Sequence, residues 1–130
     1  MVKPNIPAPG DIWWLDMSPF TGKEQAGRHP GLIISGFVFN RATGFAVVAP
    51  ISTVANAARN SNFAVTLSGA GTETTGMIQV DQVRSLDWRK RGATERKERV
   101  PDHILREVLE RYAPIVGLGL LEPDVVEDDQ

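Results

Sequence analysis

The stretch EQAGRHPGLIIS, residues 24–35, places a carboxylate, an arginine and one of the two histidines of the chain directly before Pro30 and an apolar run. The β-branched half of the stretch predicts a strand that begins near the proline. The polar half has two interpretations: a turn that leads into the strand, where polar residues are expected in any case, or a catalytic loop. The segments on either side of this stretch bear on both the fold and that choice.

Several other segments have the composition of short strands, because they are rich in β-branched and aromatic residues and are bounded by turn residues. NRATG (40–44) predicts a tight turn or a helical turn, and residues 52–62 predict a mobile loop because they contain few large apolar side chains. Five or six short strands without long intervening helices predict a mostly β fold built as a small barrel. The predicted strand segments are DIWWLDM (11–17), GLIISGFVF (31–39), FAVVAPIS (45–52), NFAVTLS (62–68), GMIQVDQV (76–83) and RSLDW (84–88).

One long helix is predicted near the end of the chain, after Pro101. Asp102 lies in its first turn, where the helix dipole favours a carboxylate, and apolar residues recur at helical spacing as far as Val116. Gly117 is a natural stop, and Pro114 is expected to distort the last turn because it removes a backbone hydrogen bond. The helix is expected to pack against the barrel or against a partner, which makes the fold class mostly β (α+β).

The length of 130 residues fits one domain, predicted over residues 1–121, followed by an acidic and disordered tail at 122–130. The tail holds five of the 16 acidic residues and no Lys or Arg, so residues 1–121 carry 14 basic against 11 acidic residues, a net charge of +3. The basic run at 84–99 indicates either a nucleic-acid surface or, as charge runs more often are, a solvated face. The absence of cysteine, of a signal peptide and of a membrane span predicts a cytoplasmic protein.

The sequence contains no spacing of His, Asp and Glu that resembles a metal site, and no Walker-type loop or nucleophile elbow. We therefore predict no metal and no cofactor. The chemistry that remains needs only acids, bases and hydroxyls, and each candidate side chain also has a structural interpretation as a loop, turn or strand-end residue. The concentrated candidates are Glu24, Arg28, His29, Ser52, Thr53 and Asp81.

Whole segments, taken in order, resemble the MazF/PemK family of toxin endoribonucleases. They are GDIWWLDMSPFTGKEQAGRHPGLIIS, FNRATGFAVVAPIST, FAVTLSG, GMIQVDQVRSLDWRKRGA and a closing amphipathic helix, and the resemblance runs from about residue 10 to residue 117. It implies an SH3-like β-barrel with a C-terminal α-helix, assembled as a homodimer. It also implies metal-independent cleavage of single-stranded mRNA at short sequence motifs, inhibited by a cognate antitoxin of a type II toxin–antitoxin system.

The chemistry of RNA agrees with this implied activity. The 2′-hydroxyl can attack the adjacent phosphate once a base takes its proton and cations stabilise the developing charge. The alternative is a non-catalytic binding protein of the same fold, either of the gyrase-poison type or an inactive family member.

The resemblance carries over to individual residues. Glu24 matches the loop glutamate of the family's RNA site, Ser52 matches its strand-end threonine, and Asp81 matches an acidic residue of some members. The family usually has arginine immediately before the proline, whereas this chain has His29 there and Arg28 one residue earlier. This inversion is the best argument for the inactive alternative.

Two mechanisms follow from the inversion. In the first, Arg28 reaches the scissile phosphate because Gly27 lets the loop reorient. In the second, His29 occupies the site as a general acid or base. We favour a shared site, with Arg28 as electrostatic stabiliser and His29 as the group that transfers a proton.

A second set of residues is predicted to bind RNA without taking part in the chemistry. Basic residues can hold phosphates along a groove, and an aromatic ring can stack on an unpaired base. The two adjacent tryptophans of DIWWLD should face opposite ways, so only one is expected in the core. The predicted RNA-binding residues are Thr53, Asp81, Arg84, Arg89, Lys90, Arg91 and Trp14.

Overall fold

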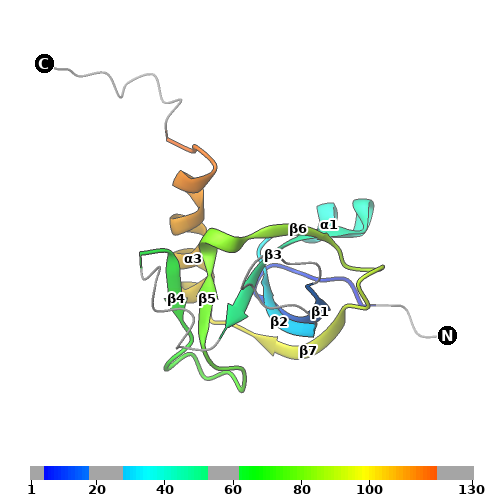
Figure 1. The fold of residues 1–130 in the computed structure, drawn as a ribbon, viewed down its shortest axis with the longest axis horizontal. Helices are drawn as coiled ribbons and strands as arrows, with labels where there is room; N and C mark the ends of the chain where they lie inside the picture. Colours follow the sequence, from blue (N-terminus) through cyan, green and yellow to red (C-terminus); the bar gives the residue numbers. More distant parts are fainter. Residues whose placement is uncertain (1–4, 18–27, 53–61, 120–130) are drawn as a thin grey trace, which may run out of the picture.

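The computed structural model describes residues 5–17, 28–52 and 62–119 of the chain. Strands dominate the fold, and one long helix follows the last strand (Figure 1). The elements are β1 (Asp11–Asp16), β2 (Arg28–Ile33), α1 (Phe37–Thr43), β3 (Phe45–Ser52), β4 (Ala64–Thr66), β5 (Met77–Gln79), the 3-10 turn η2 (Val80–Gln82), β6 (Arg84–Asp87), β7 (Thr94–Arg99) and α3 (Asp102–Ile115).

The strands form an antiparallel sheet in the order β4-β5-β3-β2-β1-β7, with β6 also paired to β3. The eight-residue strand β3 is the centre of this arrangement, because β2 pairs along one of its edges while β6 and β5 pair with its two ends. The predicted mostly β class with a C-terminal helix is confirmed. The pairs among the described residues give an open path from β4 to β7, so closure into an SH3-like barrel stays a prediction.

The buried side chains form two clusters on opposite sides of the central strands. The Ile12 cluster also receives the C-terminal helix, through Ile104 and Val108. Its members are Ile12, Leu32, Ile34, Ala49, Ile51, Val65, Leu67, Ile78, Val80, Val100, Ile104 and Val108. The Trp13 cluster consists of Trp13, Leu15, Met17, Ile33, Ala46, Val48, Leu86 and Trp88.

The alternation of side chains along β1 distributes its residues between these clusters. Ile12 belongs to one cluster, while Trp13 and Leu15 belong to the other. Trp13 is buried and packs edge-on against Trp88, with ring centroids 6.2 Å apart, whereas Trp14 is only half-buried. The prediction that only one of the adjacent tryptophans reaches the core is confirmed.

The prediction of one continuous strand over residues 31–39 is wrong. Strand β2 ends at Ile33, and FVFNRAT forms the short helix α1, which ends at Gly44 in the left-handed conformation. The cause is Asn40, which is fully buried and whose amide donates to the carbonyls of Pro7 (2.7 Å) and Ser35 (3.1 Å). The hydrogen bond to Pro7, 33 residues away, together with the nearby bond to Ser35, therefore overrides the β propensity of the phenylalanines. Of the two predictions for residues 40–44, the helical turn is confirmed.

Strand β7 was not among the predicted strands. Its sequence, TERKER, contains no large apolar residue, and the sequence analysis treated this stretch only as part of the basic run. It is a strand because it pairs with β1, from Thr94 opposite Trp14 to Arg99 opposite Asp11. The charged side chains of the last pair remain partly exposed. A strand at the edge of this sheet order needs no continuous apolar face.

Helix α3 agrees with its prediction. It begins at Asp102, contains Pro114 and ends at Ile115, and Gly117 follows with a positive φ of 84°. In the described part of the chain, no helix has the length and apolar character required to cross a membrane. The acidic tail (122–130) and most of the predicted loop at 52–62 lie outside the described residues.

Candidate active site

Arg28 and His29 begin strand β2 and lie on opposite faces of the sheet. In the pairing with β1, Arg28 is opposite Asp16 and His29 is opposite Leu15. Paired residues of antiparallel strands point to the same face, and Leu15 belongs to the Trp13 cluster. His29 therefore lies on the face of the Trp13 cluster, and Arg28 lies on the other face.

The guanidinium of Arg28 is held by the turn between β6 and β7. Nη1 donates to the carbonyl of Gly92 (2.9 Å), and Nη2 donates to Oγ1 of Thr94 (3.0 Å). These two bonds tie the guanidinium to the β6–β7 turn and to the first residue of β7. The side chain thus has a structural role in this arrangement.

Ser52 is the last residue of β3 and is half-buried. Ala49 and Ile51 belong to the Ile12 cluster and Val48 to the Trp13 cluster, so alternation places Pro50 and Ser52 on the face of the Trp13 cluster. The pairing of β2 with β3 ends at Gly31 and Pro50, and the same register continued by two residues brings His29 level with Ser52. Of the two residues before Pro30, His29 is therefore the one that shares a face with Ser52.

Arg84 and Arg91 hold the end of β1 from two sides. Arg84 Nη1 donates to the carbonyl of Met17 (2.6 Å), and Arg91 Nη1 donates to the carbonyl of Asp16 (3.1 Å). Arg84 is paired with Val48 and so also lies on the face of the Trp13 cluster. Both side chains fix the backbone that leads into residues 18–27, where Glu24 lies. Glu24 and Thr53 themselves lie outside the described residues.

Arg89 and Lys90 lie at the other end of β3. Arg89 covers the Trp88 ring at 4.8 Å, donates to the carbonyl of Arg41 (3.1 Å) and approaches Gly44, the residue before β3. The rise along an eight-residue strand separates the two ends of β3 by roughly 23 Å. The structure therefore does not bring this exposed pair next to Ser52.

Two other predicted RNA-binding residues have separate positions. Asp81 is exposed on η2, the turn from β5 to β6. Trp14 lies on the same face as Arg28, and the guanidinium carbon of Arg96 lies 4.9 Å from the centre of its ring. One side of this predicted stacking platform is thus already occupied by a cation.

The sequence analysis missed a largely covered carboxylate in β7, that of Glu98, whose side chain is 10% exposed. Its Oε2 accepts hydrogen bonds from Thr74 Oγ1 (2.6 Å) and Arg96 Nε (3.1 Å), and its Oε1 accepts one from the backbone N–H of Thr74 (3.0 Å). Burial raises the pKa of this carboxyl, but the bonds from the Thr74 side chain and backbone, from Arg96 and from the Glu73 backbone outweigh burial, so its net pKa is lowered. Nothing in the local pattern TERKER signals a partner 24 residues away.

Comparison with known proteins gives consistent results. The family described as the PemK-like, MazF-like toxin of type II toxin–antitoxin systems matches residues 8–116. Endoribonuclease PemK of Escherichia coli is 44% identical over 107 residues, which cover 82% of this chain and 80% of that protein. Endoribonuclease toxin MazF of E. coli K12 is 38% identical over 104 residues, covering 80% of this chain and 89% of that protein.

Solved structures agree with the sequence relatives. The crystal structure of MazF from Deinococcus radiodurans has a TM-score of 0.77 at 34% identity and covers 88% of this chain and 99% of that one. A MazE–MazF complex from the same organism gives a TM-score of 0.73 at 29% identity, covering 89% of this chain and all of that one. The chain therefore belongs to the PemK-like, MazF-like toxin family of type II toxin–antitoxin systems.

Proposed function

We propose that the protein is the toxin of a type II toxin–antitoxin pair and an endoribonuclease that cuts single-stranded mRNA without a metal ion. Relatives at 44% and 38% identity are named endoribonucleases, which supports the activity. The strand register supports the proposal most: His29 lies on the Trp13-cluster face, and the β2–β3 register, if continued two residues past Gly31 and Pro50, places it opposite Ser52. An imidazole and a hydroxyl near one strand end are the kinds of group that phosphate-ester chemistry needs.

The reaction begins when a base takes the proton of the 2′-hydroxyl. The 2′-oxygen then forms a bond to the adjacent phosphorus while the bond from phosphorus to the 5′-oxygen breaks, and the leaving 5′-oxygen receives a proton. The products are a 2′,3′-cyclic phosphate and a 5′-hydroxyl. His29 can supply or accept one of these protons because imidazole has one nitrogen that donates and one that accepts.

Ser52 and the cations have supporting roles in this proposal. The Ser52 hydroxyl donates to a non-bridging phosphate oxygen, where negative charge develops. Arg84 lies on the same face, and its guanidinium adds positive charge there. Glu24 remains the second proton-transfer candidate through the resemblance alone. Arg28, which was expected to share the site as a stabiliser, is now the weaker candidate because it lies on the opposite face and is bound to the β6–β7 turn.

The remaining predicted RNA contacts lie outside this group. Thr53 follows Ser52, while Asp81, Trp14, Arg89, Lys90 and Arg91 stay candidates for contacts to flanking nucleotides. Because Arg89 and Lys90 lie at the far end of β3, they would contact only an RNA that extends several nucleotides from the cut. Their contribution to affinity should fall with increasing salt, as phosphate contacts do.

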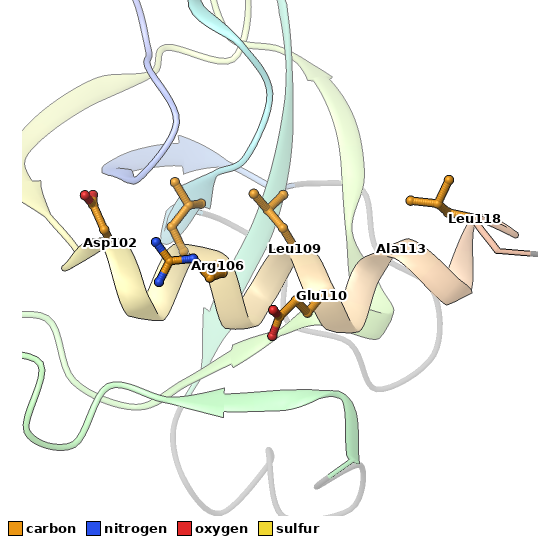
Figure 2. A pocket seen from close by; sticks show the side chains of 7 residues that line it. Asp102, Arg106, Leu109, Glu110, Ala113 and Leu118 are labelled. Carbon is orange, nitrogen blue, oxygen red and sulfur yellow. The ribbon is translucent and has the colours of Figure 1, made fainter.

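We also propose a homodimer that forms through the exposed face of α3. A groove of about 470 Å³ follows this helix, and Figure 2 shows side chains from Asp102 to Leu118 along it. Leu109 is 41% exposed and Leu118 is 68% exposed, and together with Leu105 they line this groove with apolar surface. Asp102, Arg106 and Glu110 also line the groove, so a second copy that is offset by one helical turn could place its Arg106 against Glu110.

The cognate antitoxin is the proposed inhibitor. Solved relatives include MazE–MazF complexes, which supports a protein partner for this chain as well. We further propose that residues 1–121 form one domain followed by the acidic tail, and that the protein acts in the cytoplasm.

The direct test incubates the purified protein with a long single-stranded RNA in excess EDTA and maps the new ends. We expect cuts at a short recurring motif that leave 2′,3′-cyclic phosphate ends, and cleavage at least about 100-fold slower when His29→Ala replaces the wild type. Intact RNA with the wild-type protein, at concentrations that give measurable RNA binding, would instead indicate the binding protein of the same fold. The inverted order of Arg28 and His29 is the feature that supports this alternative, a binding protein without catalysis.

A further inference from the structure

Strand β7 contains an irregularity in its pairing with β1. The pairing with β1 passes from Ile12–Glu98 to Trp13–Glu95, so it skips Arg96 and Lys97. Lys97 has a φ of 62°, and among the described residues it is the non-glycine residue with positive φ. A bulge of this kind costs free energy, and such bulges are found where they direct a side chain to a particular position.

The bulge places Glu98 where it binds a loop that is distant in sequence. Both carboxylate oxygens contact Thr74 in the loop between β4 and β5, one through the backbone N–H and one through the hydroxyl. The side chain of Glu98 is only 10% exposed, and Thr74 is 7% exposed. Arg96, which is also in the bulge, donates to the same carboxylate, so its charge is compensated.

The loop that Glu98 binds packs against the backbone of Ser52 at its other end. Gly76, two residues after Thr74, has a φ of 118°, and a Cβ at this position would lie 2.3 Å from the Ser52 carbonyl oxygen. The next residue, Met77, is the β5 partner of Ser52, and β5 is only three residues long. The end of β3 that carries Ser52 is therefore held, on this edge, by a short strand whose preceding loop is bound by Glu98.

We propose that Glu98 is a positioning residue for the Ser52 end of β3, acting through Thr74 and Gly76. This inference rests on the proposed function, in which the Ser52 hydroxyl contacts the reacting phosphate. Loss of the Glu98–Thr74 bonds frees the loop, widens the range of positions of the Ser52 hydroxyl and lowers the rate of cleavage. RNA affinity changes little, because neither Glu98 nor Thr74 contacts RNA in this proposal. A misplacement of about 1 Å at a reacting group can reduce a rate by about 100-fold.

The test compares Glu98→Gln and Thr74→Val with matched controls. Glu98→Gln keeps the shape of the side chain and removes its charge, and Thr74→Val removes the hydroxyl and keeps the volume. Glu95→Gln is the control for the first change, because Glu95 is in the same strand and its carboxylate binds the exposed Asn5. Thr74→Ser is the control for the second, because it restores the hydroxyl.

Three quantities are measured for each variant: the single-turnover cleavage rate, the affinity for an RNA with a 2′-deoxy group at the cut, and the urea midpoint. We expect Glu98→Gln and Thr74→Val to cut about 10-fold or more slowly, with RNA affinity within about twofold and the fold intact under assay conditions. Both controls should keep the wild-type rate. Unchanged rates in both variants, or losses that Thr74→Ser shares with Thr74→Val, would overturn the inference.

Amide hydrogen exchange separates this inference from the proposed function. In Glu98→Gln, exchange should become faster at Thr74, Met77 and Ser52 and stay unchanged in the β1–β2 pair. If the wild-type protein leaves RNA intact, the proposed function fails, and exchange alone then decides whether Glu98 holds this strand end. Equal exchange in the wild type and Glu98→Gln would reject that role.

Discussion

At the scale of single residues, the order of Arg28 and His29 matters because successive residues of a strand point to opposite faces. Exchanging the two residues exchanges which of them shares a face with Ser52. His29 is opposite Leu15, within the Trp13-cluster face, and Arg28 is bound to Gly92 and Thr94 on the other face. The sequence analysis favoured a site shared by both side chains, and the strand register now favours His29.

Replacing His29 should therefore affect cleavage more than replacing Arg28. We expect His29→Ala to reduce the single-turnover rate by at least about 100-fold, the usual contribution of a proton-transferring group. Arg28→Ala should reduce it by less than about 10-fold and lower the free energy of unfolding by about 1 kcal/mol, because it loses two hydrogen bonds. Fluorescent single-stranded RNA and urea titrations give the two quantities. Full activity in His29→Ala would contradict this assignment.

Gly76 is a position where adding a single carbon atom, the Cβ, should destabilise the fold. Gly76→Ala combines a positive φ with a Cβ that would lie 2.3 Å from a backbone oxygen, so we expect a loss of about 2–4 kcal/mol in the free energy of unfolding. Gly69→Ala is the matched control: its φ is 78° but nothing lies within 4 Å of the new Cβ, so it should cost only about 1 kcal/mol. Equal losses in the two variants would show that Ser52 moves freely away from Gly76.

At the scale of elements, β7 differs from the predicted strands because its own sequence contains no large apolar residue. It is a strand only through its pairing with β1. The bulge forces Lys97 into the left-handed region, which costs about 1–2 kcal/mol for a residue with a side chain. Lys97→Gly removes most of this cost and adds some chain entropy to the unfolded state, so the net gain should be roughly 0.5–1 kcal/mol. Lys90→Gly, at an exposed turn without positive φ, should give no gain. Thermal or urea unfolding measures both variants, and a loss in Lys97→Gly would contradict the strain.

Glu98 makes the stability of this element depend on pH. Its folded-state pKa is lower than its unfolded-state pKa, so its contribution is fully present above the unfolded-state pKa and is lost as the pH falls through the folded-state pKa. Between neutral pH and the acidic range, wild-type protein should lose more stability than Glu98→Gln, which has no proton to bind. Urea titrations across this range test the difference, with Glu95→Gln as the variant expected to follow the wild type. Parallel curves for wild type and Glu98→Gln would contradict it.

At the scale of the whole molecule, α3 leaves an apolar face outside the core. Ile104 and Val108 are buried against the sheet, while Leu109 and Leu118 line the exposed groove. Leu109→Glu should therefore convert the proposed dimer into a monomer, because a charge would have to be buried in the interface. His103→Glu, an exposed position of the same helix outside the groove lining, should leave the dimer intact. Light scattering after size-exclusion chromatography gives the masses, and a Leu109→Glu dimer would place the interface elsewhere.

The sequence by itself determined the elements whose own residues carry the signal. Alternating or continuous apolar runs predicted β1, β3 and β5, and helical spacing between Pro101 and Gly117 predicted α3. Position-by-position resemblance also identified His29 and Ser52 as candidates. These features are local, because an element that buries one face of its own must show that face in its sequence.

Only the tertiary structure decided the features that depend on partners far away in the chain. The buried amide of Asn40 turns a β-prone segment into α1, and pairing with β1 makes a strand of the charged segment β7. The faces of Arg28 and His29 follow from the register of β2, and the bonds between Glu98 and Thr74 join residues 24 positions apart. Local periodicity contains no record of such hydrogen bonds and registers, since they form only when the whole chain has folded.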